Sequence, residues 1–120
     1  MKYMALIYTD PSREEGMTAE DREANLARYI EFSRAGREQG TVVGGDELAS
    51  PSSATRVRVV DGETVVTDGP YAETKEQLGG FFMLECDSID EAVQLAAKIP
   101  GAAHGAIEVR PLHVDPEEAA

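Results

Sequence analysis

The stretch of the sequence richest in reactive groups is 68–80, which reads DGPYAETKEQLGG. It brings together three carboxylates, one phenol and one amine, at Asp68, Glu73, Glu76, Tyr71 and Lys75. Groups of these types, held close together, are suited to acid/base catalysis and to stabilising negative charge. We therefore predict a small-molecule site in which Asp68 is the general base or orienting carboxylate and Lys75 the stabilising cation. Tyr71 would be a wall or proton donor, and Glu73 would help to bind the ligand.

The same stretch also has a purely structural interpretation. An Asp-Gly-Pro sequence at the end of a strand requires a turn, and carboxylates in turns usually accept hydrogen bonds from nearby backbone amides. Asp68 would then serve the turn, and the charged residues after it would be solvated. The two interpretations predict different effects of Asp68→Asn. If Asp68 belongs to a ligand site, the change should remove ligand binding; if Asp68 serves the turn, the change should lower only the stability of the protein.

A second pair of charged residues, Glu108 and Arg110, alternates with apolar residues near the end of the chain. Alternation places both on one face of a strand, away from the apolar face that helices would cover. One interpretation is a cross-strand ion pair, for example with Arg56 or Arg58. The other is that Arg110 binds the carboxylate or phenolate of a ligand.

The elements that must position these groups follow from hydrophobic pattern and capping residues. Thr18 with Asp21, and Ser88 with Glu91, are typical of helix starts, and Asp61-Gly62 is a hairpin signal. The patterns predict strands at 2–9, 41–48, 55–60, 64–67, 79–86 and 106–110, and helices at about 19–39 and 88–99. This order predicts a ferredoxin-like α+β fold with an antiparallel sheet and a hairpin inserted before the third core strand.

Two helices can cover only one face of such a sheet. The first strand is substantially apolar on both faces. The face that points away from the helices is therefore apolar whether it carries Tyr3, Ala5 and Ile7 or the residues that alternate with them. We therefore expect two sheets to meet face to face in a homodimer.

Composition excludes several classes of protein. The chain has 11 Lys and Arg against 23 Asp and Glu, a formal charge of −12, and its basic residues are scattered, which argues against binding nucleic acid. The one cysteine, Cys86, forms no internal disulfide and fits a small core position. Neither histidine has an obvious partner, so we predict no metal site and, without a phosphate-binding glycine loop, no nucleotide cofactor.

The organisation expected is one domain over 1–114 and a disordered acidic tail at 115–120. The apolar run at the start of the chain is too short for a signal peptide or a membrane span. We therefore expect a cytoplasmic protein that does not associate with membranes.

Residues 68–82, DGPYAETKEQLGGFF, resemble the signature of the YCII-related family in its DGPF-type branch. The similarity extends through the first four residues, through Asp90-Glu91-Ala92 and through 108–111, EVRP, so it covers nearly the whole chain. Tyr71 stands where the branch usually has phenylalanine. The resemblance implies a dimeric α+β barrel, in agreement with the pairing expected from the pattern.

The resemblance also implies two kinds of function. Related members are similar to small lyase-like or dehydrochlorinase-type enzymes with a proposed His–Asp acid/base pair at the mouth of the barrel. Here Asn25 stands at the histidine position and cannot titrate, and Asp46 corresponds to the partner carboxylate. With Arg110, both would line a binding site. The alternative is a non-enzymatic interaction module accessory to an extracytoplasmic-function sigma factor.

Overall fold

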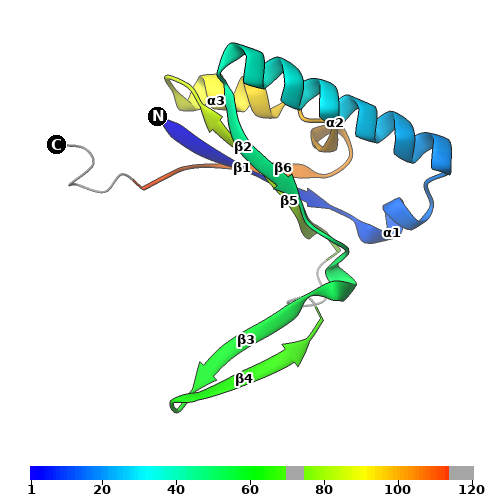
Figure 1. The fold of residues 1–120 in the computed structure, drawn as a ribbon, viewed down its shortest axis with the longest axis vertical. Coiled ribbons are helices and arrows are strands. Elements are labelled where there is room, and N and C mark those ends of the chain that lie inside the picture. The colour runs from blue at the N-terminus through cyan, green and yellow to red at the C-terminus, as the bar shows by residue number, and fades with distance from the viewer. Residues whose placement is uncertain (70–74, 114–120) are drawn as a thin grey trace.

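The computed structural model describes residues 1–69 and 75–113 and shows a ferredoxin-like α+β fold built on a four-stranded antiparallel sheet (Figure 1). The strand order is β2-β5-β1-β6. The strands of this sheet are β1 (Lys2–Thr9), β2 (Val42–Glu47), β5 (Gln77–Glu85) and β6 (Ala106–Pro111). The helices α2 (Ala19–Gln39) and α3 (Ile89–Ala96) lie together on one face of the sheet. The fold class expected from the sequence is thereby confirmed.

The two helices begin and end where local chemistry directs. Thr18 and Asp21 form the reciprocal capping box at the start of α2, with hydrogen bonds of 3.0 and 3.1 Å. Gly40 ends α2 in the left-handed conformation, at φ 76°. Ser88 caps α3 by accepting a hydrogen bond from the Glu91 amide at 3.2 Å. The predicted starts and the end of α2 are therefore correct.

The second helix is shorter than the sequence pattern predicts, since α3 ends at Ala96 and the pattern extends to about residue 99. The next amides, those of Lys98 and Ile99, bond three residues back instead of four. Ile99 precedes Pro100, and the proline ring disfavours helical backbone in the residue before it. The chain then enters the 3₁₀ turn η2 (Pro100–Ala103).

A short helix, α1 (Pro11–Glu15), follows β1 and is absent from the sequence prediction. Asp10 caps it by accepting hydrogen bonds from the Ser12 amide at 3.0 Å and the Ser12 hydroxyl at 2.7 Å. Proline suits the first turn of a helix because its missing N–H needs no partner there. The strand ends at Thr9 as predicted, and Asp10-Pro11 then begins a helix.

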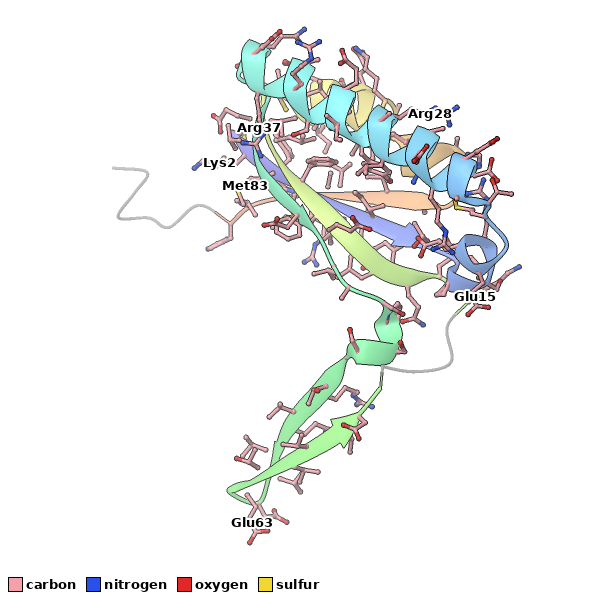
Figure 2. All side chains as sticks on the ribbon, turned by 45° about the vertical axis from the view of Figure 1, so that its right-hand side comes forward. Lys2, Glu15, Arg28, Arg37, Glu63 and Met83 are labelled. Carbon is pink, nitrogen blue, oxygen red and sulfur yellow. The ribbon has the colours of Figure 1, made fainter. Side chains whose placement is uncertain are left out.

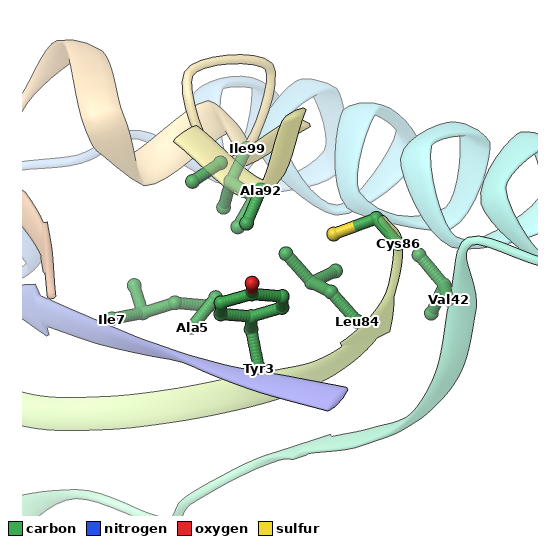
Figure 3. Packing of buried hydrophobic residues seen from close by; sticks show 9 residues of the cluster. Tyr3, Ala5, Ile7, Val42, Leu84, Cys86, Ala92 and Ile99 are labelled. Atoms are coloured by element: carbon green, nitrogen blue, oxygen red, sulfur yellow. The ribbon is translucent and has the colours of Figure 1, made fainter. Parts of the chain in front are cut away.

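The core lies between the sheet and the helices (Figure 3). Leu84 and Ile99 are its largest fully buried side chains. Cys86 is buried among them, which confirms its expected structural place. The buried hydrophobic residues are Tyr3, Ala5, Ile7, Val42, Leu84, Cys86, Ala92, Ala96 and Ile99. The face of β1 that carries Tyr3 therefore points to the helices.

The inserted hairpin consists of β3 (Thr55–Val60) and β4 (Glu63–Asp68), which pair with each other in a separate two-stranded sheet. We call these residues, 55–68, the arm. Asp61 and Gly62 both have positive φ, 51° and 80°, as a tight two-residue hairpin turn requires. The short turn η1 (Pro51–Ser53) leads into the arm.

The arm projects from one end of the sheet, on the side away from the helices (Figures 1 and 2). Glu63, near its tip, lies far from Arg28 of α2 in Figure 2. The radius of gyration is 16.6 Å. A compact chain of this length would have a radius of about 13.6 Å. The projecting arm contributes to this larger radius.

Candidate functional site

The face of the sheet turned away from the helices, which we call the open face, is apolar at its centre. Alternate residues of a strand point to opposite faces, so the β1 residues between the buried ones point outward. In the strand register Met4 lies opposite Met83, and Leu6 lies opposite Phe81. Within residues 1–69 and 75–113, no helix or strand packs on this face. The partly exposed apolar and aromatic side chains on it are Met4, Leu6, Tyr8, Phe81 and Met83.

Polar groups border this apolar strip on β6. Glu108 lies opposite Leu6 and Arg110 lies opposite Met4, so both are on the open face, as alternation predicts. Tyr8 of β1 lies beside Glu108 of β6 on this face, near enough for the Glu108 carboxylate to act on the Tyr8 phenol. Burial raises the pKa of Tyr8, the neighbouring Glu108 carboxylate raises it further, and the charge of Arg110 lowers it. Tyr8 therefore stays protonated at neutral pH beside one carboxylate and one guanidinium.

These neighbours test the ion-pair interpretation of Glu108 and Arg110. Arg56 and Arg58 belong to the arm, in a different sheet from β6, so the suggested cross-strand ion pairs with them are wrong. Glu108 instead lies beside Tyr8 of β1, on the same face as Arg110. Three polar groups thus lie at the border of an apolar surface: a tyrosine hydroxyl, a carboxylate and an arginine. Such a group can bind the carboxylate of an organic acid and a hydroxyl group of the same acid.

The open face carries charges of both signs. Register and alternation place two basic residues there, Lys2 and Arg110, and three acidic ones, Asp46, Glu85 and Glu108, for a net charge of −1. A surface of mixed charge can place its basic groups against the acidic groups of a molecule that docks on it.

The residues that correspond to the family's acid/base pair lie on different sides of the sheet. Asp46 pairs in register with Phe81 and points to the open face, where it is exposed. Asn25 is partly buried on α2, over the opposite face. They cannot act as a directly bonded pair. The carboxylate of β2 that points toward the helices is Glu47, opposite the buried Gly80, and the sequence analysis did not identify it.

The 68–80 stretch is described in part. Asp68 is the last residue of β4, exposed and opposite Thr55 at the base of the arm. Lys75 is exposed and lies near Asp10. Hydrogen bonds from Ser12 hold the pKa of the Asp10 carboxyl below its usual value, and the charge of Lys75 lowers this pKa further. Tyr71 and Glu73 lie outside the described residues. A catalytic or binding role for this stretch stays a prediction.

Tyr29 occupies a crowded position on the helix-covered side. Burial raises the pKa of its phenol, and the charges of Glu14 and Glu47 raise this pKa further. A hydrogen bond from the Gly101 amide acts in the opposite direction and lowers the pKa. Both carboxylates border a hollow of about 340 Å³ at the base of the arm. The sequence signal for Tyr29 was its helical spacing, which indicates burial and says nothing of the carboxylates brought near it by the fold.

A larger hollow, of about 700 Å³, runs between α2 and the α3–η2 segment. Phe32 and Ile99 contribute apolar surface to it, and Arg28 and Lys98 contribute cations. It lies on the opposite side of the sheet from Tyr8 and Arg110. Binding at either location can therefore be distinguished by variants that do not disturb the other.

Comparison with known proteins identifies the family of this chain. Residues 1–114 match the YCII-related domain, and the chain belongs to this family. The chain is 38% identical over 114 residues to "Uncharacterized protein R00369" of Rhizobium meliloti (strain 1021), covering 93% of this chain and 92% of that protein. In the described part of the chain, no helix has the length and apolar character needed to span a membrane.

Proposed function

We propose that this protein, a DGPF-type member of its family, binds small aromatic or hydroxylated carboxylic acids on the open face of its sheet. The observation that carries the proposal is the group formed by Tyr8, Glu108 and Arg110 at the border of an apolar strip. Charged groups are commonly placed at the edge of ligand sites to orient a mostly apolar ligand.

Each part of the proposed ligand has a counterpart on this face. Arg110 offers a planar guanidinium that suits a carboxylate. Phe81 offers an aromatic face to the ring of the ligand, and Met4 and Met83 offer polarisable thioethers. The Tyr8–Glu108 pair offers a hydroxyl oxygen and a carboxylate that can accept a hydrogen bond from a ligand hydroxyl. A phenolic acid satisfies all three.

A second copy of this chain closes the site in the proposed arrangement. An open strip containing Met4, Leu6 and Phe81 would leave a bound ligand in water, where polar contacts are weak. A second open face covers it with matching apolar surface, and two faces of net charge −1 repel each other little. The site then lies between two sheets, each contributing an Arg110.

A thermal-shift titration tests the proposal, with 4-hydroxybenzoate, benzoate and pyruvate as probes. The wild type should be stabilised, by about 2.7 kcal/mol at 100 times the dissociation constant, and 4-hydroxybenzoate should bind most tightly. Arg110→Gln should weaken its binding at least tenfold. Arg28→Gln, the same change on the far side of the sheet, is the matched control and should not alter binding.

Two results would contradict this function. One is equal binding by the wild type and Arg110→Gln; the other is no stabilisation of the wild type by any of the three acids. A parallel titration of Asp68→Asn measures what the predicted loop adds. Lost binding with unchanged stability would place the loop at the site, whereas lost stability alone would make Asp68 a structural turn residue.

A further inference from the structure

The arm exposes apolar side chains on a two-stranded sheet that pairs with no other strand of the described structure. Val57 and Val66 lie directly opposite each other, with 63% and 58% of their surfaces exposed, and Val59 beside them is 70% exposed. We call these three residues the valine face. A lone two-stranded hairpin is marginally stable in water, and contiguous exposed apolar residues mark interaction surfaces. The valine face therefore needs a partner.

The position of the arm indicates where the partner lies. The arm leaves the end of the sheet on the side of the open face, opposite α2 and α3 (Figure 2). Each of its strands has six residues. At 3.3 Å per residue the arm is about 20 Å long, twice the separation of about 10 Å between two packed sheets. An arm of this length extends past the sheet of any molecule seated on the open face.

The charges of the arm are of both signs. Residues 55–68 contain two basic residues, Arg56 and Arg58, and three acidic ones. The open face also carries charges of both signs, so basic groups of one copy can be placed against acidic groups of the other.

We propose that the arm of each copy clasps the other copy, with the valine face packed against the flank of the partner that covers the open face. This inference rests on the second copy invoked in the proposed function, and it adds the contact that holds the two copies together. It also makes the site composite, because the partner's arm closes its edge. The valine face is buried only in the dimer.

The experiment compares two matched double variants by sedimentation velocity over a range of concentrations. Val57→Thr with Val66→Thr alters the valine face. Val60→Thr with Val65→Thr makes the same change on the opposite face of the arm, at side chains that are 44% and 40% exposed. Threonine has nearly the shape and strand preference of valine, so both variants should keep the hairpin. The first should raise the dimer dissociation constant at least tenfold, and the second less than threefold.

Hydrogen exchange supplies a second readout that does not depend on variants. The β3 and β4 amides should exchange slowly at concentrations where the wild type is dimeric and much faster after dilution to monomer. A wild type that is monomeric at all concentrations, equal effects of the two double variants, or arm exchange unaffected by dilution would overturn the clasp. Acid binding that depends on Arg110 could still be observed in each of these cases, so the two proposals fail separately.

Discussion

Tyr8 of the inner strand β1 lies beside Glu108 of the edge strand β6 on the open face of the sheet, where burial and the Glu108 carboxylate raise the pKa of its phenol. Arg110 lies on the same face of β6 as Glu108. The chemistry proposed for this face depends on this contact, because an ionised Tyr8 would repel both Glu108 and an acidic ligand.

The titration of Tyr8 should therefore respond to Glu108. Because Glu108 raises the pKa of Tyr8, Glu108→Gln should lower that pKa. The ultraviolet absorbance of tyrosinate measures the change, and the difference between the wild type and Tyr8→Phe identifies the signal of Tyr8. A folded-state pKa above the unfolded value of about 10 adds stability below pH 10 that is lost as pH rises through the folded value. The wild type should thus lose more stability in alkali than Tyr8→Phe. An unchanged Tyr8 titration in Glu108→Gln would contradict the contact.

Gly101 should resist substitution because of Tyr29. A Cβ on Gly101 would stand 2.7 Å from the Tyr29 hydroxyl and 3.1 Å from a methyl group of Ile7. Gly101→Ala should cost about 1–3 kcal/mol of unfolding free energy, the usual range for overpacking. In a Tyr29→Phe background the same change should cost less, since the closer atom is gone. Equal costs in urea denaturation of the two backgrounds would disprove this explanation.

The Thr18 cap should make a measurable contribution to stability. Thr18→Ala removes the acceptor for the Asp21 amide and should cost about 1 kcal/mol. Thr18→Ser retains the hydroxyl and is the matched control. The midpoint of denaturant unfolding should fall in the first variant with an unchanged slope. A fall of equal size in Thr18→Ser would show that packing of the methyl group, and not the hydrogen bond, is responsible.

Cys86 should react slowly with alkylating reagents. Burial raises the pKa of its thiol and the Glu91 charge raises it further, and the thiolate is the reactive form. Native protein should therefore be modified by iodoacetamide far more slowly than urea-unfolded protein at the same pH. Glu91→Gln should leave most of this protection, because burial is the larger cause. Equal rates in native and unfolded protein would contradict the core position.

Local features of the fold could be predicted from the sequence because they are determined by adjacent residues. The caps at Thr18 and Ser88, and the turn at Asp61-Gly62, are short-range chemistry and are correct. Helix α1 was missed because Asp-Pro signals both the end of a strand and the start of a helix. The end of α3 was misplaced because apolar spacing continues beyond Ala96, while Pro100 already directs the backbone out of the helix.

The candidate site could be predicted only in part, because it depends on which strands pair with each other and in which register. The sequence pattern does not show either of these. Alternation showed that Glu108 and Arg110 share a face, yet only the β1–β6 register reveals Tyr8 as their neighbour. The same register separates them from Arg56 and Arg58, which lie in the arm. Alternation along β2 could show that Asp46 and Glu47 point to opposite faces, but not which of them faces the helices.

The most direct test of the central claim, that an organic acid binds on the open face, is to map amide NMR shifts during titration with 4-hydroxybenzoate. We predict that the largest changes fall on Leu6, Phe81 and Arg110, and that Arg110→Gln abolishes them at the same acid concentration. Changes centred on Arg28 and Lys98, in the groove between α2 and α3, would contradict the claim, as would the absence of any change.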